Sequence, residues 1–222
     1  MNPTRSITAV ALCTILLTGC GVAPLAPPAP PPVVRPTAFI ALGLGAAYLS
    51  TDIIGGTRAR AAKLKAAKIR PLAPAAVPNY MYRAEQELRR QTAGIGIDVI
   101  RVPDGLLLRV PATLTFDPGS AAIKPQIDAT LTEISRTLKT FNQTYVDVLA
   151  HTDTSGTPQV NQALSQKRAN AAAAFLGGHG VAKARIASKG FGESSPLYAV
   201  ETSEAEKAGN RRLEIRLVPY RG

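Results

Sequence analysis

The chain has 222 residues and a formal net charge of +11, with two cysteines and two histidines. This length leaves room for one domain with extensions. So few thiol and imidazole groups exclude a disulfide framework and leave a zinc site short of ligands. Residues 1–90 hold 11 Lys or Arg against 3 Asp or Glu, so most of the excess positive charge lies in the N-terminal part of the chain.

The N-terminus predicts export. Arg5 precedes an apolar run over residues 7–17, which is shorter than the roughly 20 residues that a membrane span needs. Leu17-Thr18-Gly19-Cys20 follows and resembles the lipobox of bacterial lipoproteins. We therefore expect residues 1–19 to be a signal peptide and Cys20 to carry acyl chains. The alternative is a plain signal peptide that happens to contain a cysteine.

Lipidation also accounts for the cysteine usage. Cys13 lies within the segment to be removed, so the mature chain would keep Cys20 alone. Two or more acyl chains would anchor the protein stably. Gly21 follows the cysteine, and by resemblance to enterobacterial lipoproteins this favours the outer membrane, with the folded part in the periplasm. An exported, acylated protein should rarely meet nucleic acid, so anionic lipid or wall polymer is the expected electrostatic partner.

Three segments precede the expected domain. Residues 20–36 combine the cysteine with seven prolines, which favours a semi-rigid polyproline spacer. Residues 37–94 begin with a small-residue apolar run over 38–49. This run is either a short helix that is buried or interfacial, or a segment whose glycines let another helix approach closely. Residues 58–70 then place six cations all around a helix. A solvated basic helix and attraction to anionic head groups both remain open there.

From residue 95 to residue 222 the pattern predicts one folded domain, preceded by a helix over about 80–90. Alternating apolar residues around a Pro-Asp-Gly turn predict a hairpin, and apolar residues at spacings of three and four predict an amphipathic helix. Thr157 and Pro158 are typical of a helix start. The expected elements are strands at 95–99, 106–108, 145–150, 185–189 and 213–218, and helices at 123–141, 158–176 and 202–208. This order predicts an α/β (α+β) two-layer sandwich with helices packed on one mixed sheet.

One face of the helix after Pro158 carries apolar residues together with Asn161 and Arg168. An inward-facing guanidinium needs an anion, and Asp153, just before this helix, is the nearest candidate. Together Asp153 and Arg168 would hold an ammonium and a carboxylate, as a zwitterionic amino acid requires. A structural salt bridge, or an Asx turn at Asp153, is an equally simple interpretation.

The stretch HTDTSGTPQVNQALSQKRAN, residues 151–170, resembles the signature of OmpA-like C-terminal domains, which peptidoglycan-associated lipoproteins and flagellar stator anchors share. Phe116-Asp117, the Lys-Gly-Phe-Gly of residues 189–192 and the Asn-Arg-Arg-Leu-Glu-Ile of residues 210–215 extend the resemblance over about 96–219. It implies a βαβαβ sandwich that binds diaminopimelate in the wall peptide. The preceding segment also resembles that of glycine-zipper outer-membrane lipoproteins, although it has few glycines.

The resemblance implies roles for particular residues. Asp153 would receive the ammonium of the ligand and Arg168 would hold its carboxylate, with Asn161 as a supporting hydrogen-bond partner. The remaining residues expected to border the cleft are Phe116, Asp117, Thr152 and Arg211. Arg211 lies in line with the apolar residues of the last strand, so a buried carboxylate is an equally good partner for it.

We expect no catalysis and no cofactor. The sequence has no nucleophile elbow, and both histidines, His151 and His179, fit structural positions at the end of a strand and of a helix. The predicted function is a non-enzymatic tether between outer membrane and peptidoglycan. The alternative is a wall-tethered component of an envelope or secretion assembly, and contact with other envelope proteins or a second copy is compatible with either.

Overall fold

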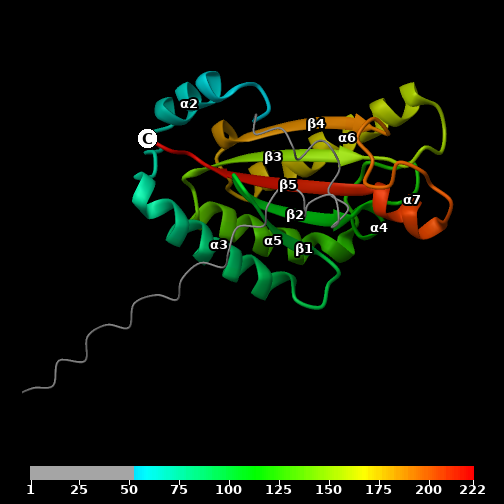
Figure 1. The fold of residues 1–222 in the computed structure, drawn as a ribbon, viewed down its shortest axis with the longest axis horizontal. Coiled ribbons are helices and arrows are strands. Elements are labelled where there is room, and N and C mark those ends of the chain that lie inside the picture. Colours follow the sequence, from blue (N-terminus) through cyan, green and yellow to red (C-terminus); the bar gives the residue numbers. More distant parts are fainter. Residues whose placement is uncertain (1–52) are drawn as a thin grey trace, which may run out of the picture.

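The computed structural model describes residues 53–222, so the predicted signal peptide, Cys20, the proline-rich spacer and the apolar run over 38–49 lie outside the described residues. A mixed five-stranded sheet forms the centre, in the order β1-β2-β5-β3-β4 (Figure 1). β3 and β4 are parallel, and the other neighbours are antiparallel. The strands are β1 Asp98–Val102, β2 Gly105–Pro111, β3 Thr144–His151, β4 Ile186–Gly192 and β5 Arg212–Pro219.

The larger helices α3, α5 and α6 pack on one face of the sheet, and the predicted fold class is confirmed. No helix within residues 53–222 has the length and apolar character needed to cross a bilayer. The α-helices are α2 Thr57–Ala66, α3 Val77–Thr92, α4 Ala112–Thr115, α5 Pro125–Thr140, α6 Pro158–Gly178 and α7 Glu204–Asn210, with short 3-10 helices at Pro74–Ala76 and Lys183–Arg185.

The hydrophobic pattern explains why the two layers meet. In β5, Leu213, Ile215 and Leu217 point to the helical layer and are fully buried, as period-two alternation requires. The apolar stripe of α5 faces them. The N-terminus of α6 begins as expected, because the Thr157 hydroxyl accepts a hydrogen bond from the backbone N–H of Val160 at 3.3 Å.

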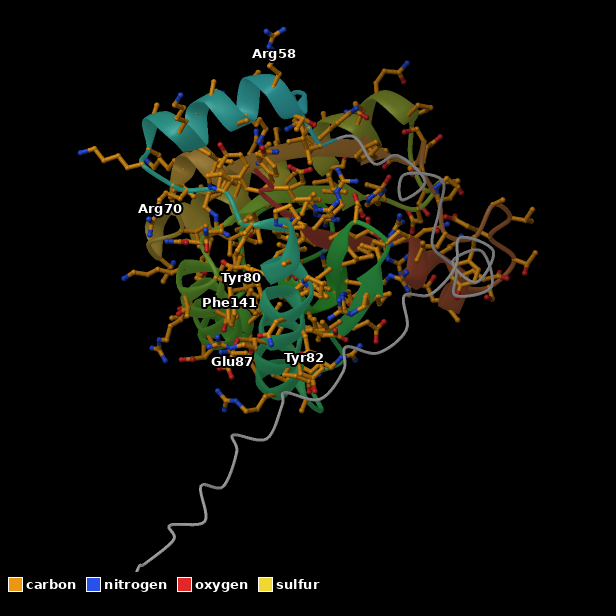
Figure 2. The ribbon with its side chains drawn as sticks, turned by 60° about the vertical axis from the view of Figure 1, so that its left-hand side comes forward. Arg58, Arg70, Tyr80, Tyr82, Glu87 and Phe141 are labelled. Carbon is orange, nitrogen blue, oxygen red and sulfur yellow. The ribbon has the colours of Figure 1, made fainter. Side chains whose placement is uncertain are left out.

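Helix α3 belongs to the same core. Met81, Ala84 and Leu88 are buried in it, N-terminal to the expected domain start at residue 95. The Tyr80 ring packs edge-on against Phe141 with centroids 5.3 Å apart (Figure 2). The division at residues 94 and 95 stays a prediction, although the core itself extends to this helix.

Helix α2 differs from a solvated basic helix, which is one of the two interpretations that the sequence leaves open. Arg60 and Leu64 are buried, because α2 lies against the start of β3 and the turn before β4. The Arg60 guanidinium pairs with the buried carboxylate of Asp147 and also donates to the backbone carbonyl of Arg185. A helical projection placed cations on every side, so it could not show that one of them has a buried acceptor. Arg58, by contrast, points into solvent (Figure 2).

Arg185, whose backbone carbonyl accepts from Arg60, joins the end of α5, the start of β3 and the turn before β4. Its side chain is fully buried and donates to the carbonyls of Leu138 at 2.5 Å, Phe141 at 2.9 Å and Thr144 at 2.8 Å. It therefore caps the end of α5 and fixes the start of β3. Burial lowers the pKa of Arg185 to about 10, which leaves the guanidinium charged at neutral pH.

We predict that Arg60→Ala lowers the free energy of unfolding by about 1.5–3 kcal/mol, because it removes one of the two buried guanidinium groups that pair with the Asp147 carboxylate, the other being that of Arg216. Arg58→Ala is the matched control in the same helix, and its effect should stay within about 0.5 kcal/mol. Urea denaturation of both variants measures the difference. Equal effects would show that α2 does not depend on the Arg60–Asp147 pair.

Candidate functional site

A cavity of about 710 Å³ opens at the carboxyl end of β3, at the end of the molecule formed by α4, α7 and the start of α6 (Figure 1). Ligands of α/β sheets commonly bind beyond the carboxyl ends of strands. Six of the seven expected site residues line this cavity. The lining residues are Ala112, Thr113, Phe116, Pro118, Gly119, Lys124, Thr152, Asp153, Ser155, Val160, Asn161, Leu164, Arg168, Glu204 and Arg211.

Asp153 lines this cavity and is 5% exposed. One carboxylate oxygen accepts a hydrogen bond from the backbone N–H of Ser155 at 3.1 Å, which is the Asx turn considered from the sequence. The other accepts from Arg211 at 2.5 Å. Arg211, which also pairs with Glu204, therefore serves a carboxylate and borders the cavity at the same time.

Arg168 is held by backbone carbonyls, and the expected direct pairing with Asp153 is wrong. Its Nε donates to the carbonyl of Ser120 at 2.8 Å and its Nη2 to that of Asp117 at 3.1 Å. The guanidinium carbon lies 5.0 Å from the centroid of the Phe116 ring, over its face. The backbone carbonyls of the 116–120 loop therefore accept the hydrogen bonds of Arg168, for which the sequence had suggested the carboxylate of Asp153. These hydrogen bonds fix Arg168 in the cavity wall.

Asn161 and Thr152 have distinct places. The side-chain amide of Asn161 donates to the backbone carbonyl of Asp153 at 3.2 Å and to Glu193 at 2.6 Å. Asn161 therefore orients the loop that carries Asp153. The Thr152 hydroxyl is buried and has no hydrogen-bond partner within residues 53–222, although it lies in the cavity wall. A buried hydroxyl without a partner is uncommon, and a bound ligand could supply one.

Asp117 is placed differently from the expectation. Its carboxylate is 69% exposed and lies 3.2 Å from Lys124, so only its backbone carbonyl takes part in the site. Sequence reasoning missed Lys124, Glu204 and Leu164 as lining residues. Leu164 shares a helical face with Asn161, and this spacing could have identified it. Lys124 and Glu204 sit beside helix starts, where charged residues are too common to be informative.

Glycines let α6 approach β4 closely enough to place Asn161 and Arg168. A Cβ atom on Gly190 would lie 2.2 Å from the backbone nitrogen of Gln166, so any larger residue would push the helix away. The side chain of Gln162 closes this contact by donating to the Gly190 carbonyl at 3.0 Å. The Lys-Gly-Phe-Gly motif of residues 189–192 therefore acts on the site through packing.

The charges of the site are coupled. Burial lowers the pKa of Arg168, the positive charge of Arg211 lowers it further, and Asp153 partly opposes both. For Arg211 burial also favours the neutral form, but hydrogen bonds to Asp153 and Glu204 outweigh it and raise the pKa. Lys124, Arg168 and Arg211 outnumber the acidic lining residues, so the cavity carries an excess of positive charge.

His151 lies directly behind the site, at the end of β3. Its side chain is buried, its Nε2 lies 3.2 Å from a carboxylate oxygen of Glu214, and its ring stacks on Phe191. Burial lowers the pKa of His151 and outweighs the attraction of the Glu214 carboxylate. The position is structural, and neither His151 nor His179 lines the cavity.

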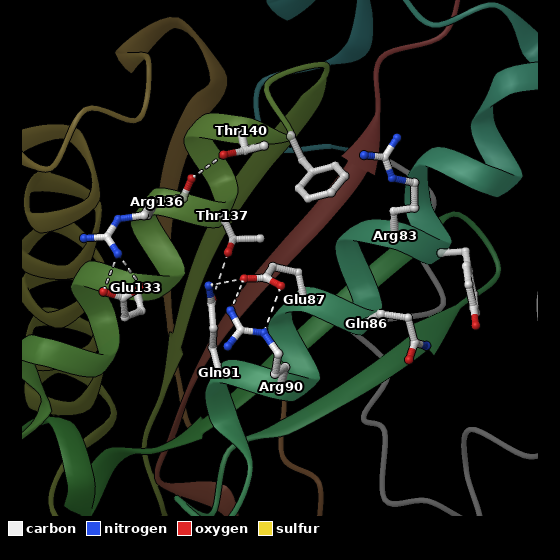
Figure 3. A pocket seen from close by; sticks show the side chains of 11 residues that line it. Arg83, Gln86, Glu87, Arg90, Gln91, Glu133, Arg136, Thr137 and Thr140 are labelled. Atoms are coloured by element: carbon white, nitrogen blue, oxygen red, sulfur yellow. Dashed lines mark hydrogen bonds and ion pairs between the residues drawn. The ribbon is translucent and has the colours of Figure 1, made fainter.

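A second depression of about 550 Å³ lies between α3 and α5 (Figure 3). Its charged side chains pair with one another, Arg90 with Glu87 and Arg136 with Glu133. Gln91 bridges the two helices through Glu87 and Thr137. Because these groups already satisfy one another at the surface, this depression is a weaker candidate than the cavity beside β3.

Residues 115–211 match the OmpA family, and the chain therefore contains an OmpA-like domain. The match begins one residue before Phe116 and ends at Arg211. It therefore includes the cavity-lining residues Asp153, Asn161 and Arg168.

Among curated relatives, the chain is 40% identical over 140 residues to "Probable lipoprotein YiaD" of Escherichia coli K12, which covers 63% of this chain and 64% of the relative. The cell wall anchor of the T6SS from Pseudomonas aeruginosa has a similar structure, with a TM-score of 0.54 and 26% identity over 60% of this chain and 96% of the other. A MotB-like protein from Desulfovibrio vulgaris shares the fold, with a TM-score of 0.57 and 24% identity over 64% and 95% of the two chains.

The buried histidine predicts a pH dependence. Because folding depresses the pKa of His151, the unfolded chain binds the proton more readily, and stability is lost as the pH falls through and below about 6.5. We expect His151→Gln to flatten the fall in the free energy of unfolding between pH 7.5 and pH 5, by at most about 1.4 kcal/mol per pH unit. Urea denaturation across this range measures it, with the exposed His179→Gln as control. Parallel curves for wild type and His151→Gln would refute the assignment.

Proposed function

We propose that this chain is a non-enzymatic outer-membrane lipoprotein whose OmpA-like domain binds the diaminopimelate-containing peptide of peptidoglycan without covalent attachment. The observation that supports this most directly is the cavity beside β3, in which the buried Asp153 and Arg168 present opposite charges to one space. The likeness to a solved cell wall anchor at 26% identity supports the same class of ligand.

The hydrogen-bonding capacity of both side chains leaves room for such a ligand. A guanidinium has five N–H donors, and Arg168 uses two of them on backbone carbonyls through Nε and Nη2. The Nη1 end therefore remains for a ligand carboxylate. A carboxylate offers about four lone-pair sites, and Asp153 uses two, on Ser155 and Arg211, so it can accept a ligand ammonium as well.

The ligand preference follows from this pairing. The side chain of diaminopimelate carries an amine and a carboxylate on one carbon at its far end, whereas a lysine side chain ends in an amine alone. We propose that Arg168 distinguishes the two, because a lysine-type wall peptide would leave the buried guanidinium without its anion. Thr152, whose buried hydroxyl lacks a partner, is a further hydrogen-bond donor or acceptor for the bound peptide.

We predict that Asp153→Asn and Arg168→Gln each weaken binding to purified peptidoglycan about tenfold to a hundredfold, because a hydrogen bond to a charged group contributes about 1.5–3 kcal/mol. A quantitative pull-down with diaminopimelate-type sacculi measures this. Free diaminopimelate should compete with sacculi for the wild-type domain, and Nα-acetyl-lysine amide, which presents a side-chain ammonium and no carboxylate, should compete much less.

Glu87→Gln on α3 is the matched control, because it removes a carboxylate from the other depression and should leave binding unchanged. Urea midpoints near the wild-type value exclude unfolding as the cause of a loss. Full retention of the Asp153→Asn/Arg168→Gln double variant on sacculi would rule out this binding site. Release of soluble wall fragments during the incubation would instead show that the protein is an enzyme.

We further propose that residues 1–19 are a signal peptide, that Cys20 is acylated, and that residues 20–36 and 37–94 link this anchor to the domain of residues 95–222. The similarity to a relative named a lipoprotein supports the anchor. Mass spectrometry of the mature N-terminus should find a diacylglyceryl modification on Cys20 and no residues before it. The Cys20→Ser variant should be lost from the membrane fraction. A Cys20→Ser variant that stays bound to the membrane would contradict lipid anchoring.

A role within an envelope or secretion assembly is the second candidate, favoured by the likeness to the T6SS wall anchor. Wall binding would then be one contact among several. Crosslinking in cells should in that case capture a stable complex through residues 37–90, and the complex should persist in the Asp153→Asn/Arg168→Gln double variant.

A further inference from the structure

Helix α2 and the loop after it carry a group of exposed cations. The helix buries Arg60 and Leu64 against the domain, and its other basic side chains are exposed. The loop continues to the start of β3, where the Gln143 side chain donates to the backbone carbonyl of Arg70 at 2.9 Å. We call these exposed cations the basic surface, and they are Arg58, Lys63, Lys65, Lys68 and Arg70.

No acidic side chain within residues 53–222 pairs with the basic surface. Arg60 is the one residue of α2 that forms an ion pair there, and its partner Asp147 is shared with Arg216. The segments that meet at this end of the molecule contain no Asp or Glu, and they are residues 53–79, 136–146, 177–192 and 218–222.

The nearby acids of the sequence cannot neutralise the basic surface. Asp104, in the turn between β1 and β2, is half-buried, and the charges of Arg216 and Arg221 already act on it. Residues 1–52 hold a single acid, Asp52. The exposed cations therefore need either solvent or an anionic partner from outside the chain.

The outward face of α2 is suited to adsorption on a charged layer. Between its cations the helix exposes only small side chains, those of Ala59, Ala62 and Ala66. Its bulky apolar residue, Leu64, is buried against the domain, so α2 has nothing to insert among lipid tails. Each Lys or Arg held near an anionic bilayer strengthens binding about fivefold, so the contact adds up from charges alone.

We propose that the basic surface docks this domain on the anionic head groups of a bilayer. The place of α2 in the chain favours lipid over other anionic partners, because Ile53 follows Cys20 by 33 positions. The proposed acyl anchor on Cys20 would keep α2 close to the head groups, so that weak contacts form within one tethered molecule. The choice of this membrane rests on the proposed function, whereas the affinity for anionic lipid does not.

This docking keeps the cavity clear of the bilayer. The basic surface lies toward the start of β3, and the cavity opens beyond His151, at the far end of the strand (Figure 1). A domain that rests on α2 therefore leaves Asp153 and Arg168 accessible to wall peptide while it is bound to lipid.

Vesicle flotation of residues 20–222 with Cys20→Ser, the proposed mature chain without acyl groups, tests the docking. The chain should float with phosphatidylcholine vesicles that contain about one third phosphatidylglycerol, and not with phosphatidylcholine alone. Raising the salt from about 0.1 M to about 0.5 M should release it, because salt screens exposed charges. Lys63→Gln/Lys65→Gln should lower the partition coefficient between about tenfold and thirtyfold, since two basic contacts are lost.

Lys167→Gln/Lys207→Gln is the matched control, because it removes two positive charges from α6 and α7 and should leave flotation unchanged. Equal flotation with both kinds of vesicle would overturn the proposal. So would a Lys63→Gln/Lys65→Gln variant that floats like the wild type. If that variant floats normally but is lost from sacculi, the basic surface belongs to a wall polymer.

The docking and the proposed function fail separately. Asp153→Asn/Arg168→Gln should lose retention on sacculi and keep its flotation with anionic vesicles. Lys63→Gln/Lys65→Gln should lose flotation and keep its retention on sacculi. Urea midpoints near the wild-type value show that each variant is folded, which exchanges of exposed lysines for glutamine within a helix should allow.

A fluorophore on Ala62→Cys, in the outward face of α2, measures the orientation in the same chain. Quenchers on the head groups of anionic vesicles should dim this fluorophore. They should leave bright a fluorophore on Val160→Cys, whose side chain lies at the cavity and is 59% exposed. Equal or stronger quenching at Val160→Cys would exclude the basic surface as the docking site.

Discussion

The buried guanidinium of Arg185 is the interaction on which the rest of the structure depends. Within residues 53–222 it has no carboxylate partner, and the carbonyls that end α5 and begin β3 accept its hydrogen bonds. A buried cation without these acceptors would be prohibitively costly, so α5, β3 and the turn before β4 must keep their relative positions. The backbone carbonyl of Arg185 in turn accepts from Arg60, which extends the same constraint to α2.

This constraint reaches the cavity through β3. The strand begins at Thr144, which Arg185 holds, and ends at His151, two residues before Asp153. Helix α6 is fixed to the neighbouring β4 by the close approach at Gly190, and it carries Arg168. The separation of the two opposite charges is therefore set by strand and helix packing, and only the 116–120 loop adjusts it locally.

The sequence predicted the five strands, the helices α3, α5, α6 and α7 and the general position of the site, but not the short helix α4 that borders the cavity. Helical periodicity placed Asn161 and Arg168 on one face, and the strand ending at His151 placed Asp153 beside them. The partners of Arg168 could not be found in this way, because backbone carbonyls 48 and 51 residues away leave no mark in the choice of side chains.

The same limit applies to Arg60, which a helical projection assigns to solvent because cations occupy every side of α2. Its burial depends on Asp147, 87 residues further along the chain. Asp147 itself sits in an apolar strand, and an isolated acid there is a signal of a distant basic partner. The sequence thus indicates that Asp147 needs a basic partner, and only the folded chain identifies Arg60 as one.

The opposite placement of two features along β3 has a mechanical consequence. The chain from Ile53 and α2 attaches to the first half of this strand, at Tyr145 and Asp147, and the cavity opens at its far end, beyond His151. A pull between the two attachment points is thus directed along the strand axis. The hydrogen bonds of β3 with β4 and β5 run across that axis, so they share the load in shear and do not open one after another.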